Sequence, residues 1–194
     1  TFLDDVTRAL DAEDLVISDS PDADGSRALV LAGIFGGADT EVDERTTDIL
    51  IEAAHFDPVS IARSARRHKL PSEASKRFER GVDYTLQETA IELATRLIVE
   101  ICGGAAGAIG ASISAGDLPQ RTAIALPCAA IAQRIGRAYD EATVSRILEG
   151  LGGEVHFANG LWTVTPPAWR FDLTIDADLI EEIARIDGYA HIPD

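Results

Sequence analysis

The first part of the chain carries short apolar runs bounded by turn-forming or acidic residues. These runs predict β-strands at residues 14–19, 27–35 and 47–56. The third run holds the charged Glu52 between apolar neighbours, which is unusual for a buried strand. Together the three segments predict a small mixed or antiparallel sheet.

Helical spacing replaces the strand pattern after residue 56. Asp57-Pro58 is a typical helix start, because a capping carboxylate precedes proline in the first turn, and this helix is predicted to end near Arg67. A second, shorter helix is expected from Ser72 to just before Gly81. The clearest helix is predicted from Thr85 to Ile101, where apolar residues recur every three or four positions.

The pattern changes again after a stretch rich in Gly, Ala and Ser at residues 105–116. We expect this stretch to end one domain, so that the chain divides into residues 1–117 and 118–194. In the second part, Asn159-Gly160 between two alternating runs is a strong hairpin signal. The remaining patterns predict a strand, two helices and a last helix at residues 121–126, 127–135, 141–151 and 176–186.

This order of helix, helix and hairpin is that of a winged-helix-like domain. The whole chain is therefore predicted to have an α+β fold, in which a partial mixed or antiparallel sheet with helices is followed by a small winged-helix-like domain.

Composition places the chain among water-soluble globular proteins. It has 194 residues, a formal net charge of -16 and no uninterrupted apolar run of membrane-spanning length. Its two cysteines, Cys102 and Cys128, lie far apart in the sequence, so we expect a reduced, cytoplasmic setting with both side chains buried. Because the chain begins at Thr1 and contains no Met, we expect it to be part of a longer protein.

Positive charge is concentrated in one place. Seven of the 17 basic residues fall within residues 63–80, although the chain as a whole is acidic. The acidic balance argues against broad nucleic-acid binding, whereas a local basic cluster can recognise one anion such as RNA. The alternative is a solvated helix face with an internal pair between Glu73 and Arg77.

Four carboxylates near the last helix form a candidate metal site. Asp178, Glu181 and Glu182 share one helix face, and Asp172 lies just upstream. Such oxygen ligands suit Mg²⁺ or Ca²⁺. Acidic residues in a first helical turn also stabilise the helix dipole and form capping boxes, and spacing alone favours this second interpretation.

Glu52 and the glycines of the preceding strand, Gly33, Gly36 and Gly37, form a second candidate site. Three interpretations fit a carboxylate there. It could recognise a ligand in a pocket, form a salt bridge with a cation of residues 63–80, or lie at a sheet edge that faces water. The pattern leaves these alternatives open. The histidines are scattered, and no Ser–His–Asp order, zinc motif or phosphate-binding glycine loop indicates an ATP site.

Two long stretches carry a family resemblance. "ALVLAGIFGGADTEVDERTTDILIEAAHFDPVSIARSARRHKLPSEASKRFERGVD" and "TPPAWRFDLTIDADLIEEIARIDGYAHIPD" resemble the beta subunits of bacterial phenylalanyl-tRNA synthetases. The resemblance is collinear over nearly the whole chain. It implies that residues 1–117 correspond to the C-terminal part of the editing, tRNA-binding domain, and that residues 118–194 correspond to the family's fifth module.

The resemblance implies a role in editing. In that family a pocket hydrolyses tyrosine wrongly attached to tRNA(Phe), and its glycine-rich strand matches Gly33 to Gly37. The glutamate that reads the tyrosine hydroxyl matches Glu52, and small pocket residues match Ser72 and Ala74. The family often has threonine where this chain has Ser72, and the hydroxyl is kept. Further pocket residues, including a histidine, are expected upstream of Thr1, so this chain is expected to hold part of the editing site and to hydrolyse poorly.

The resemblance also implies partners and cofactors. Family magnesium positions match Asp172, Asp178, Glu181 and Glu182, at a site shared with the alpha subunit. Charging with phenylalanine and ATP use are implied for the alpha subunit, within a heterotetramer of two alpha and two beta chains. The cations around Pro71 become candidates either to guide the end of tRNA(Phe) into the pocket or to pair with acidic strands, and the candidates to face RNA are Arg66, Arg67, Lys69, Lys76 and Arg77.

Two other function classes compete with this one. A nucleic-acid-binding module is one, because winged-helix-like folds often bind DNA, but residues 118–194 contain six Arg and no Lys among many acids. We therefore expect no sequence-specific DNA binding. The other is a protein-interaction module without catalysis, in which the last helix and the Trp169-Arg170-Phe171 segment dock other parts of the subunit.

Overall fold

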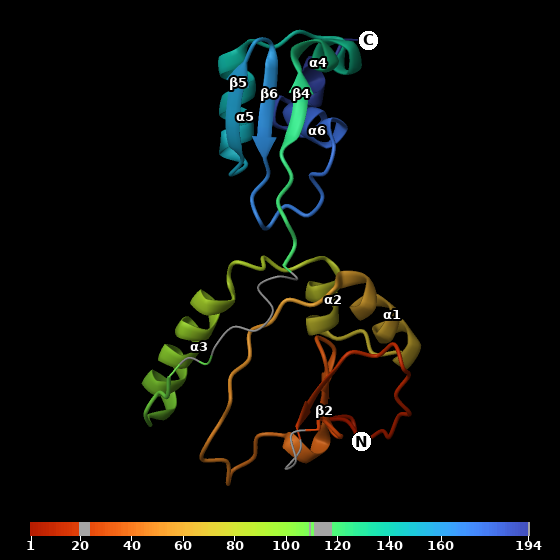
Figure 1. Cartoon of the computed structure of the whole chain (residues 1–194), viewed down its shortest axis with the longest axis vertical. Coiled ribbons are helices and arrows are strands. Elements are labelled where there is room, and N and C mark those ends of the chain that lie inside the picture. The colour runs from red at the N-terminus through yellow and green to blue at the C-terminus, as the bar shows by residue number, and fades with distance from the viewer. Residues whose placement is uncertain (20–23, 109, 111–117, 194) are drawn as a thin grey trace. The chain divides into compact units, whose positions relative to one another are not determined.

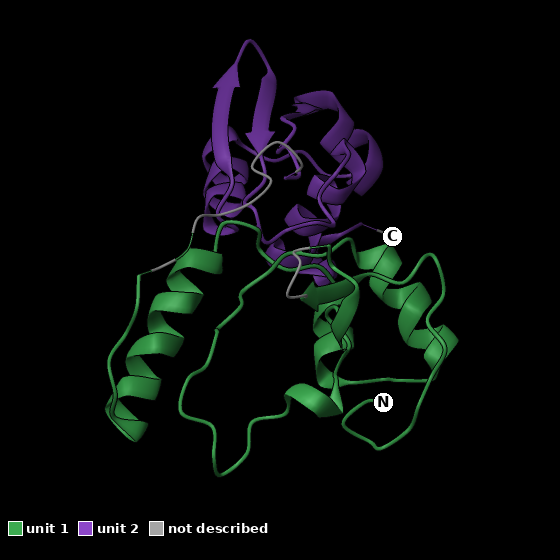
Figure 2. Cartoon of the chain, turned by 60° about the horizontal axis from the view of Figure 1, so that its bottom comes forward, with its two compact units in different colours: residues 1–111 green, residues 112–194 purple. Residues whose placement is uncertain are grey.

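The chain consists of two compact units, residues 1–111 and 112–194 (Figures 1 and 2). The computed structural model describes residues 1–19, 24–108, 110 and 118–193. Each unit has its own hydrophobic core, so each is described by itself. Much of the predicted linker at 105–116, and residue 117 beside the predicted boundary, lie outside the described residues.

Unit 1 contains a small antiparallel sheet. Its strands are β1 (Val16–Asp19), β2 (Arg27–Leu31) and β3 (Phe35–Gly36), in the order β1-β2-β3. The single strand predicted at 27–35 is wrong, because the chain turns between β2 and β3. Gly33 has a φ of +66° there, in the left-handed region that glycine adopts readily.

The strand predicted at residues 47–56 is also wrong. This segment, which we call the pocket segment, has no regular secondary structure, and Leu50 within it is 99% exposed. A strand needs a neighbour that accepts and donates ladder hydrogen bonds. No described part of the chain pairs with the pocket segment, so its apolar composition alone does not make it a strand.

Three helices complete unit 1, close to their predicted ranges. They are α1 (Pro58–His68), α2 (Glu73–Glu79) and α3 (Gln87–Cys102), and a one-turn 3₁₀ helix, η1, covers Ala38–Thr40. As predicted, Asp57 caps α1, because its carboxylate accepts a hydrogen bond from the Ser60 N–H at 2.7 Å. Helix α3 ends at Gly103 but buries none of its residues, and Ile101 on it is 78% exposed.

The core of unit 1 lies between the sheet and α1. Its buried members come from the N-terminus, from β2 and the turn after it, from α1 and from the loop that follows α1, namely Phe2, Leu31, Ile34, Ile61, Ala65 and Leu70. Ser75 in α2 is buried as well, and its hydroxyl donates to the Ser72 carbonyl at 2.9 Å.

A buried carboxylate ties α1 to the segment before β1. The Asp14 side chain has no exposed surface. It accepts hydrogen bonds from Ser64 Oγ at 2.7 Å, Arg67 Nη1 at 2.6 Å and His68 Nε2 at 2.5 Å. The Asp11 N–H donates at 2.8 Å to Oδ2, the oxygen that also faces His68, whereas Ser64 and Arg67 donate to Oδ1. Asp14 therefore joins two segments that lie about 50 residues apart in the sequence.

Unit 2 has the predicted order of helix, helix and hairpin. Strands β4, β6 and β5 form an antiparallel sheet in that spatial order, and Asn159 and Gly160 both have positive φ, as a tight two-residue hairpin turn requires. The elements are β4 (Ile124–Pro127), α4 (Cys128–Ile135), α5 (Glu141–Gly150), β5 (Glu154–Ala158), β6 (Leu161–Thr165), α6 (Asp176–Asp187) and the 3₁₀ helix η3 (Tyr189–His191).

The core of unit 2 packs its three helices against one face of the sheet. Trp162 at its centre is buried, and its indole N–H donates to Ser145 Oγ at 3.1 Å. The two antiparallel sheets and six α-helices found in the described residues confirm the predicted α+β class. The expected burial of Cys102 and Cys128 is wrong, because both are exposed. Among the described helices, none is long and apolar enough to cross a bilayer.

Candidate functional site

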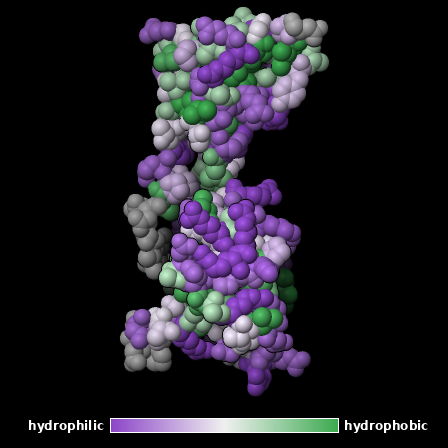
Figure 3. Space-filling model, turned by 90° about the vertical axis from the view of Figure 1, so that its right-hand side faces the viewer, coloured by the Kyte–Doolittle hydropathy of each residue, from purple (hydrophilic) through white to green (hydrophobic). Residues whose placement is uncertain are grey.

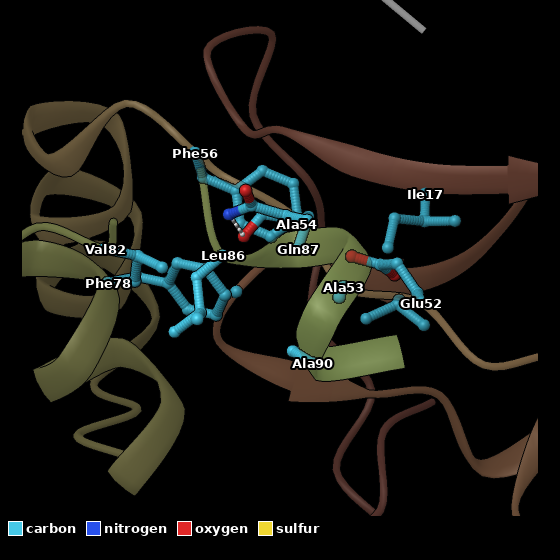
Figure 4. Close-up of a pocket in the computed structure, with 12 residues that line it drawn as sticks. Ile17, Glu52, Ala53, Ala54, Phe56, Phe78, Val82, Leu86, Gln87 and Ala90 are labelled. Carbon is cyan, nitrogen blue, oxygen red and sulfur yellow. Dashed lines mark hydrogen bonds between the residues drawn. The ribbon is translucent and has the colours of Figure 1, made fainter. Parts of the chain in front are cut away.

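A pocket of about 320 Å³ opens in unit 1 between the sheet, the pocket segment and the start of α3 (Figure 4). Glu52 and Ile17 lie toward one side of it, and Phe78, Val82 and Leu86 lie toward the other. Most of its lining is apolar. The lining residues are Ile17, Val30, Gly33, Glu52, Ala53, Ala54, Phe56, Phe78, Val82, Leu86, Gln87 and Ala90.

Gly33 lies where the pocket wall meets the core. A Cβ at this position would lie 2.9 Å from Phe56, 3.0 Å from Ile61 and 3.1 Å from Phe78. The two phenylalanine rings contact each other there, with centroids 4.9 Å apart. Glycine is therefore needed both for the positive φ of the turn and for the close approach of these side chains.

Glu52 supplies a carboxylate to the pocket. Partial desolvation raises the pKa of its carboxyl group, although the residue as a whole is exposed. Within the described residues it forms no hydrogen bond and no ion pair, so a salt bridge to a cation of residues 63–80 is absent there. The Glu52 carboxylate is thus free to accept a hydrogen bond from a ligand.

Ser72 does not line the pocket but supports the turn beside it. Its hydroxyl donates to the Ile34 carbonyl at 2.6 Å and accepts from the Ser75 N–H at 2.9 Å. It thus caps α2 and anchors that helix to the β2–β3 turn. Ala74, one residue into α2, is exposed and lies outside the pocket lining.

Gly36 and Gly37 serve strand packing and also lie outside the pocket lining. A Cβ on Gly36 would lie 2.9 Å from the Leu3 side chain, and one on Gly37 would lie 2.3 Å from the Leu29 carbonyl oxygen. The Gly37 N–H donates to that same carbonyl at 2.9 Å. Of the three glycines predicted to line the pocket, the structure brings only Gly33 beside Glu52.

The sequence interpretation missed Gln87, the first residue of α3. Its side-chain NH₂ donates to the Ala54 carbonyl at 3.3 Å and to the Asp83 carbonyl at 3.1 Å. A polar residue at a helix start carries no signal for a partner 33 positions earlier, so only the folded chain reveals this contact.

The basic residues divide into paired and unpaired groups. Arg67 is held by Asp14 at 2.6 Å and by Glu13 at 2.5 Å, and Lys76 is held by Glu73 at 2.8 Å. The predicted pair of Glu73 with Arg77 is therefore replaced by Glu73 with Lys76. Figure 3 shows a face of unit 1, in its lower half, that is largely hydrophilic (purple). Of the five cations named above as candidates to face tRNA, Arg66, Lys69 and Arg77 have no ion pair or hydrogen bond within the described residues. Arg63 and Arg80 of the same stretch have none there either.

Arginines pair with two of the four carboxylates of the candidate metal site. Arg170 contacts Asp172 at 2.6 Å and Glu182 at 3.1 Å, and Arg185 contacts Glu182 at 2.5 Å. Hydrogen bonding to Arg170 lowers the pKa of Asp172, and hydrogen bonding to Arg185 lowers that of Glu182. These two carboxylates are thus neutralised by cations of the same chain.

The other two carboxylates have different roles. Asp178 accepts hydrogen bonds from the N–H groups of Thr174 and Ile175 at 2.8 and 2.9 Å, which caps the start of α6. Glu181 is exposed. In the part of the chain that the structure describes, no three His, Cys, Asp or Glu side chains are grouped so that they would hold a metal ion.

Comparison with known families accounts for both units. The B3/4 domain family matches residues 1–103, and the tRNA synthetase B5 domain matches residues 124–189. These ranges fall in unit 1 and unit 2 respectively.

Several curated relatives align with essentially the whole chain. The phenylalanine–tRNA ligase beta subunit of Pectobacterium atrosepticum is 47% identical over 193 residues, which cover 100% of this chain and 24% of that protein. The corresponding subunit of Leifsonia xyli is 48% identical over 98% of this chain and 22% of its own length. The chain thus spans about a quarter of the curated relatives it matches. It belongs to the B3/4 domain family and carries a tRNA synthetase B5 domain in its second half.

Proposed function

We propose that this chain acts as part of a phenylalanine–tRNA ligase beta subunit, which supports the charging of tRNA(Phe) with phenylalanine and the hydrolysis of mischarged tyrosyl-tRNA(Phe). The chain is 44–48% identical to such subunits, which supports the assignment of the parent enzyme. The observation that carries the editing role is the unpaired Glu52 carboxylate in a mostly apolar pocket.

The pocket chemistry fits a phenol better than a phenyl ring. Apolar side chains such as Phe56, Phe78 and Leu86 accommodate the ring, and Glu52 accepts a hydrogen bond from a hydroxyl. Phenylalanine would leave that carboxylate without a partner. A site that pairs with a hydroxyl discriminates strongly against the analogue that lacks it, so a second site of this kind corrects errors of the first.

The test is the substitution of Glu52 in the full-length subunit. Glu52→Ala is expected to lower the preference for tyrosyl-tRNA(Phe) over phenylalanyl-tRNA(Phe) in deacylation by about ten- to a hundredfold, the loss expected for one hydrogen bond to a charged group. Glu44→Ala, at an exposed carboxylate N-terminal to the pocket segment and outside the pocket, is the matched control. An unchanged preference in Glu52→Ala would overturn the editing proposal.

The remaining parts of the reaction are assigned outside this chain. ATP binding and aminoacylation belong, in this proposal, to an alpha subunit that assembles with beta subunits into a cytoplasmic heterotetramer. This chain then contributes pocket residues and a tRNA-facing surface. We propose that alone it deacylates tyrosyl-tRNA(Phe) poorly.

Three of the unpaired cations, Arg66, Lys69 and Arg77, are proposed to face tRNA. In the full-length subunit, replacing Arg66, Lys69 and Arg77 together by alanine is expected to weaken tRNA(Phe) binding and to reduce the slope of log K against log salt by about 2. Arg67→Ala is expected to lower thermal stability instead, because Arg67 is occupied by Asp14 and Glu13. Equal losses of tRNA affinity in both variants, measured by filter binding across salt concentrations, would contradict this division.

The carboxylates of unit 2 do not fit Mg²⁺ as they are arranged. Asp172 and Glu182 are paired with arginines, and Asp178 accepts backbone hydrogen bonds. Calorimetric titration of this chain with Mg²⁺ is therefore expected to show no submicromolar binding. Arg170→Leu is expected to raise the affinity, because Arg170 contacts two of the carboxylates. A submicromolar Kd for the unsubstituted chain would show that the arginines do not block the site.

A further inference from the structure

The pocket segment carries Glu52 but is weakly held. It belongs to no sheet, and within the described residues no backbone–backbone hydrogen bond fixes residues 47–56. Among the described residues, the one hydrogen bond that reaches its backbone from another element comes from Gln87, whose Nε2 lies 3.3 Å from the Ala54 carbonyl oxygen. Ring contacts of His55 with Tyr84 and of Phe56 with Phe78 hold only the last two residues of the segment, after Ala54.

The orientation of the Gln87 carboxamide follows from its partners. Both groups near its Nε2, the carbonyls of Ala54 and Asp83, are acceptors only. The NH₂ group has two hydrogens to donate, whereas the carboxamide oxygen has none, so only one orientation satisfies both carbonyls. Gln87 therefore joins the pocket segment to the turn that precedes α3.

Gln87 is placed to control the position of Glu52. It lines the pocket, and the carbonyl that it holds is two residues from Glu52 (Figure 4). Because no ladder fixes the segment, loss of this bond would let residues 52–54 sample other positions. A hydrogen-bond acceptor that samples many positions recognises its ligand less well than one that is held in place.

We propose that Gln87 is a positioning residue, which holds the pocket segment through Ala54 so that the Glu52 carboxylate stays at the pocket. The inference rests on the proposed function only for its effect on deacylation. Its effect on the mobility of the segment is independent of the substrate.

Three variants isolate this role. Gln87→Leu removes both donors and keeps most of the side-chain volume. Gln87→Lys keeps a donor group that can reach the two carbonyls, so it is expected to restore what Gln87→Leu loses. Glu88→Leu introduces the same side chain at the next position of α3, which is exposed and outside the pocket lining, and serves as the control.

The first measurement uses this chain alone. Backbone ¹⁵N relaxation is expected to show order parameters at residues 52–55 falling from roughly 0.8 to below about 0.6 in Gln87→Leu, with values near the original in Gln87→Lys and Glu88→Leu. Unchanged order parameters in Gln87→Leu would overturn the inference. Equal loss in Gln87→Leu and Gln87→Lys would also overturn it, because the effect would then come from packing.

The second measurement uses the full-length subunit within its enzyme. Gln87→Leu is expected to lower kcat for deacylation of tyrosyl-tRNA(Phe) about tenfold with KM changed less than about twofold, and Gln87→Lys is expected to recover most of it. If Glu52→Ala has no effect on deacylation but Gln87→Leu lowers the order parameters as expected, the editing proposal is wrong and the positioning proposal holds. If Glu52→Ala abolishes the preference for tyrosyl-tRNA(Phe) but Gln87→Leu behaves as the unsubstituted protein in both measurements, the positioning proposal is wrong and the editing proposal holds.

Discussion

Asp14→Asn is expected to lower the free energy of unfolding of unit 1 by about 3 kcal/mol, the scale observed when one partner of a buried ion pair is removed. The Asp14 carboxylate is inaccessible to solvent and accepts four hydrogen bonds, from Ser64, Arg67, His68 and the Asp11 N–H. An amide cannot accept at both ends, because its NH₂ is a donor, so at least one donor in this cluster would lose its partner.

The two units allow an internal control for this prediction. Both tryptophans, Trp162 and Trp169, lie in unit 2, so tryptophan fluorescence follows that unit alone, whereas calorimetry follows both. Asp14→Asn should move the calorimetric transition of unit 1 and leave the fluorescence transition in place. Glu13→Gln should have a much smaller effect. It removes a partner of Arg67, but the Glu13 side chain is 67% exposed. If both variants shifted the calorimetric transition of unit 1 equally, the buried position of Asp14 would add no stability beyond that of an exposed carboxylate.

The stabilisation by Asp14 should also depend on pH. Burial by itself would raise the pKa of Asp14, but hydrogen bonds from the Asp11 N–H, His68, Ser64 and Arg67 hold it well below its usual range. A carboxyl group with a lowered pKa in the folded state contributes stability that is fully present above its unfolded pKa, about 4, and is lost as the pH falls toward the folded value. The stability difference between Asp14→Asn and the unsubstituted chain should therefore be constant near neutral pH and shrink below about pH 4.

Gly33→Ala is the second substitution with a large expected effect, a loss of about 2–4 kcal/mol in the stability of unit 1. Part of the loss comes from the φ of +66°, which alanine adopts at a cost. The rest comes from overpacking, because the new Cβ would lie within 3.1 Å of Phe56, Ile61 and Phe78. These side chains belong to the core or pack against it, so they have little room to move away.

Thermal unfolding of the two glycine variants tests this expectation. Gly107→Ala is the control, because a Cβ there would meet nothing within 4 Å and its φ is not positive. In the full-length subunit, Gly33→Ala should also impair deacylation of tyrosyl-tRNA(Phe), since two of the side chains it displaces, Phe56 and Phe78, line the pocket. A Gly33→Ala chain as stable as Gly107→Ala would show that the β2–β3 turn can relax without cost.

Local signals predicted most elements of the fold. Asp57-Pro58 begins α1, and Asn159-Gly160 forms the hairpin turn. Helix α2 begins at a capping box, in which the side chains of Ser72 and Ser75 each accept a hydrogen bond from the backbone N–H of the other. Each of these signals acts through hydrogen bonds or backbone angles within about four residues, so the local sequence suffices. The pocket segment was misassigned because a strand depends on a partner elsewhere, and apolar composition does not supply one.

Site residues were predicted unevenly for the same reason. The sequence, with the family resemblance, singled out Gly33 and Glu52, which the structure places together in one pocket. It did not separate them from Gly36 and Gly37, because a glycine that lines a pocket and one that permits strand pairing look alike in sequence. Gln87 was missed because its partner, the Ala54 carbonyl, is a backbone group that every residue possesses.

The sequence by itself determined the α+β class, the approximate helix and hairpin boundaries, and the presence of a cluster of cations and of one carboxylate among apolar residues. Only the tertiary structure decided which charges are free. Arg67 is bound by Asp14, which lies 53 residues earlier, whereas Arg66 beside it is unpaired. Likewise, Arg170 and Arg185 occupy carboxylates that spacing had grouped as metal ligands. Whether a charged side chain is available depends on which opposite charge the fold brings within a few ångströms, and sequence distance does not encode that.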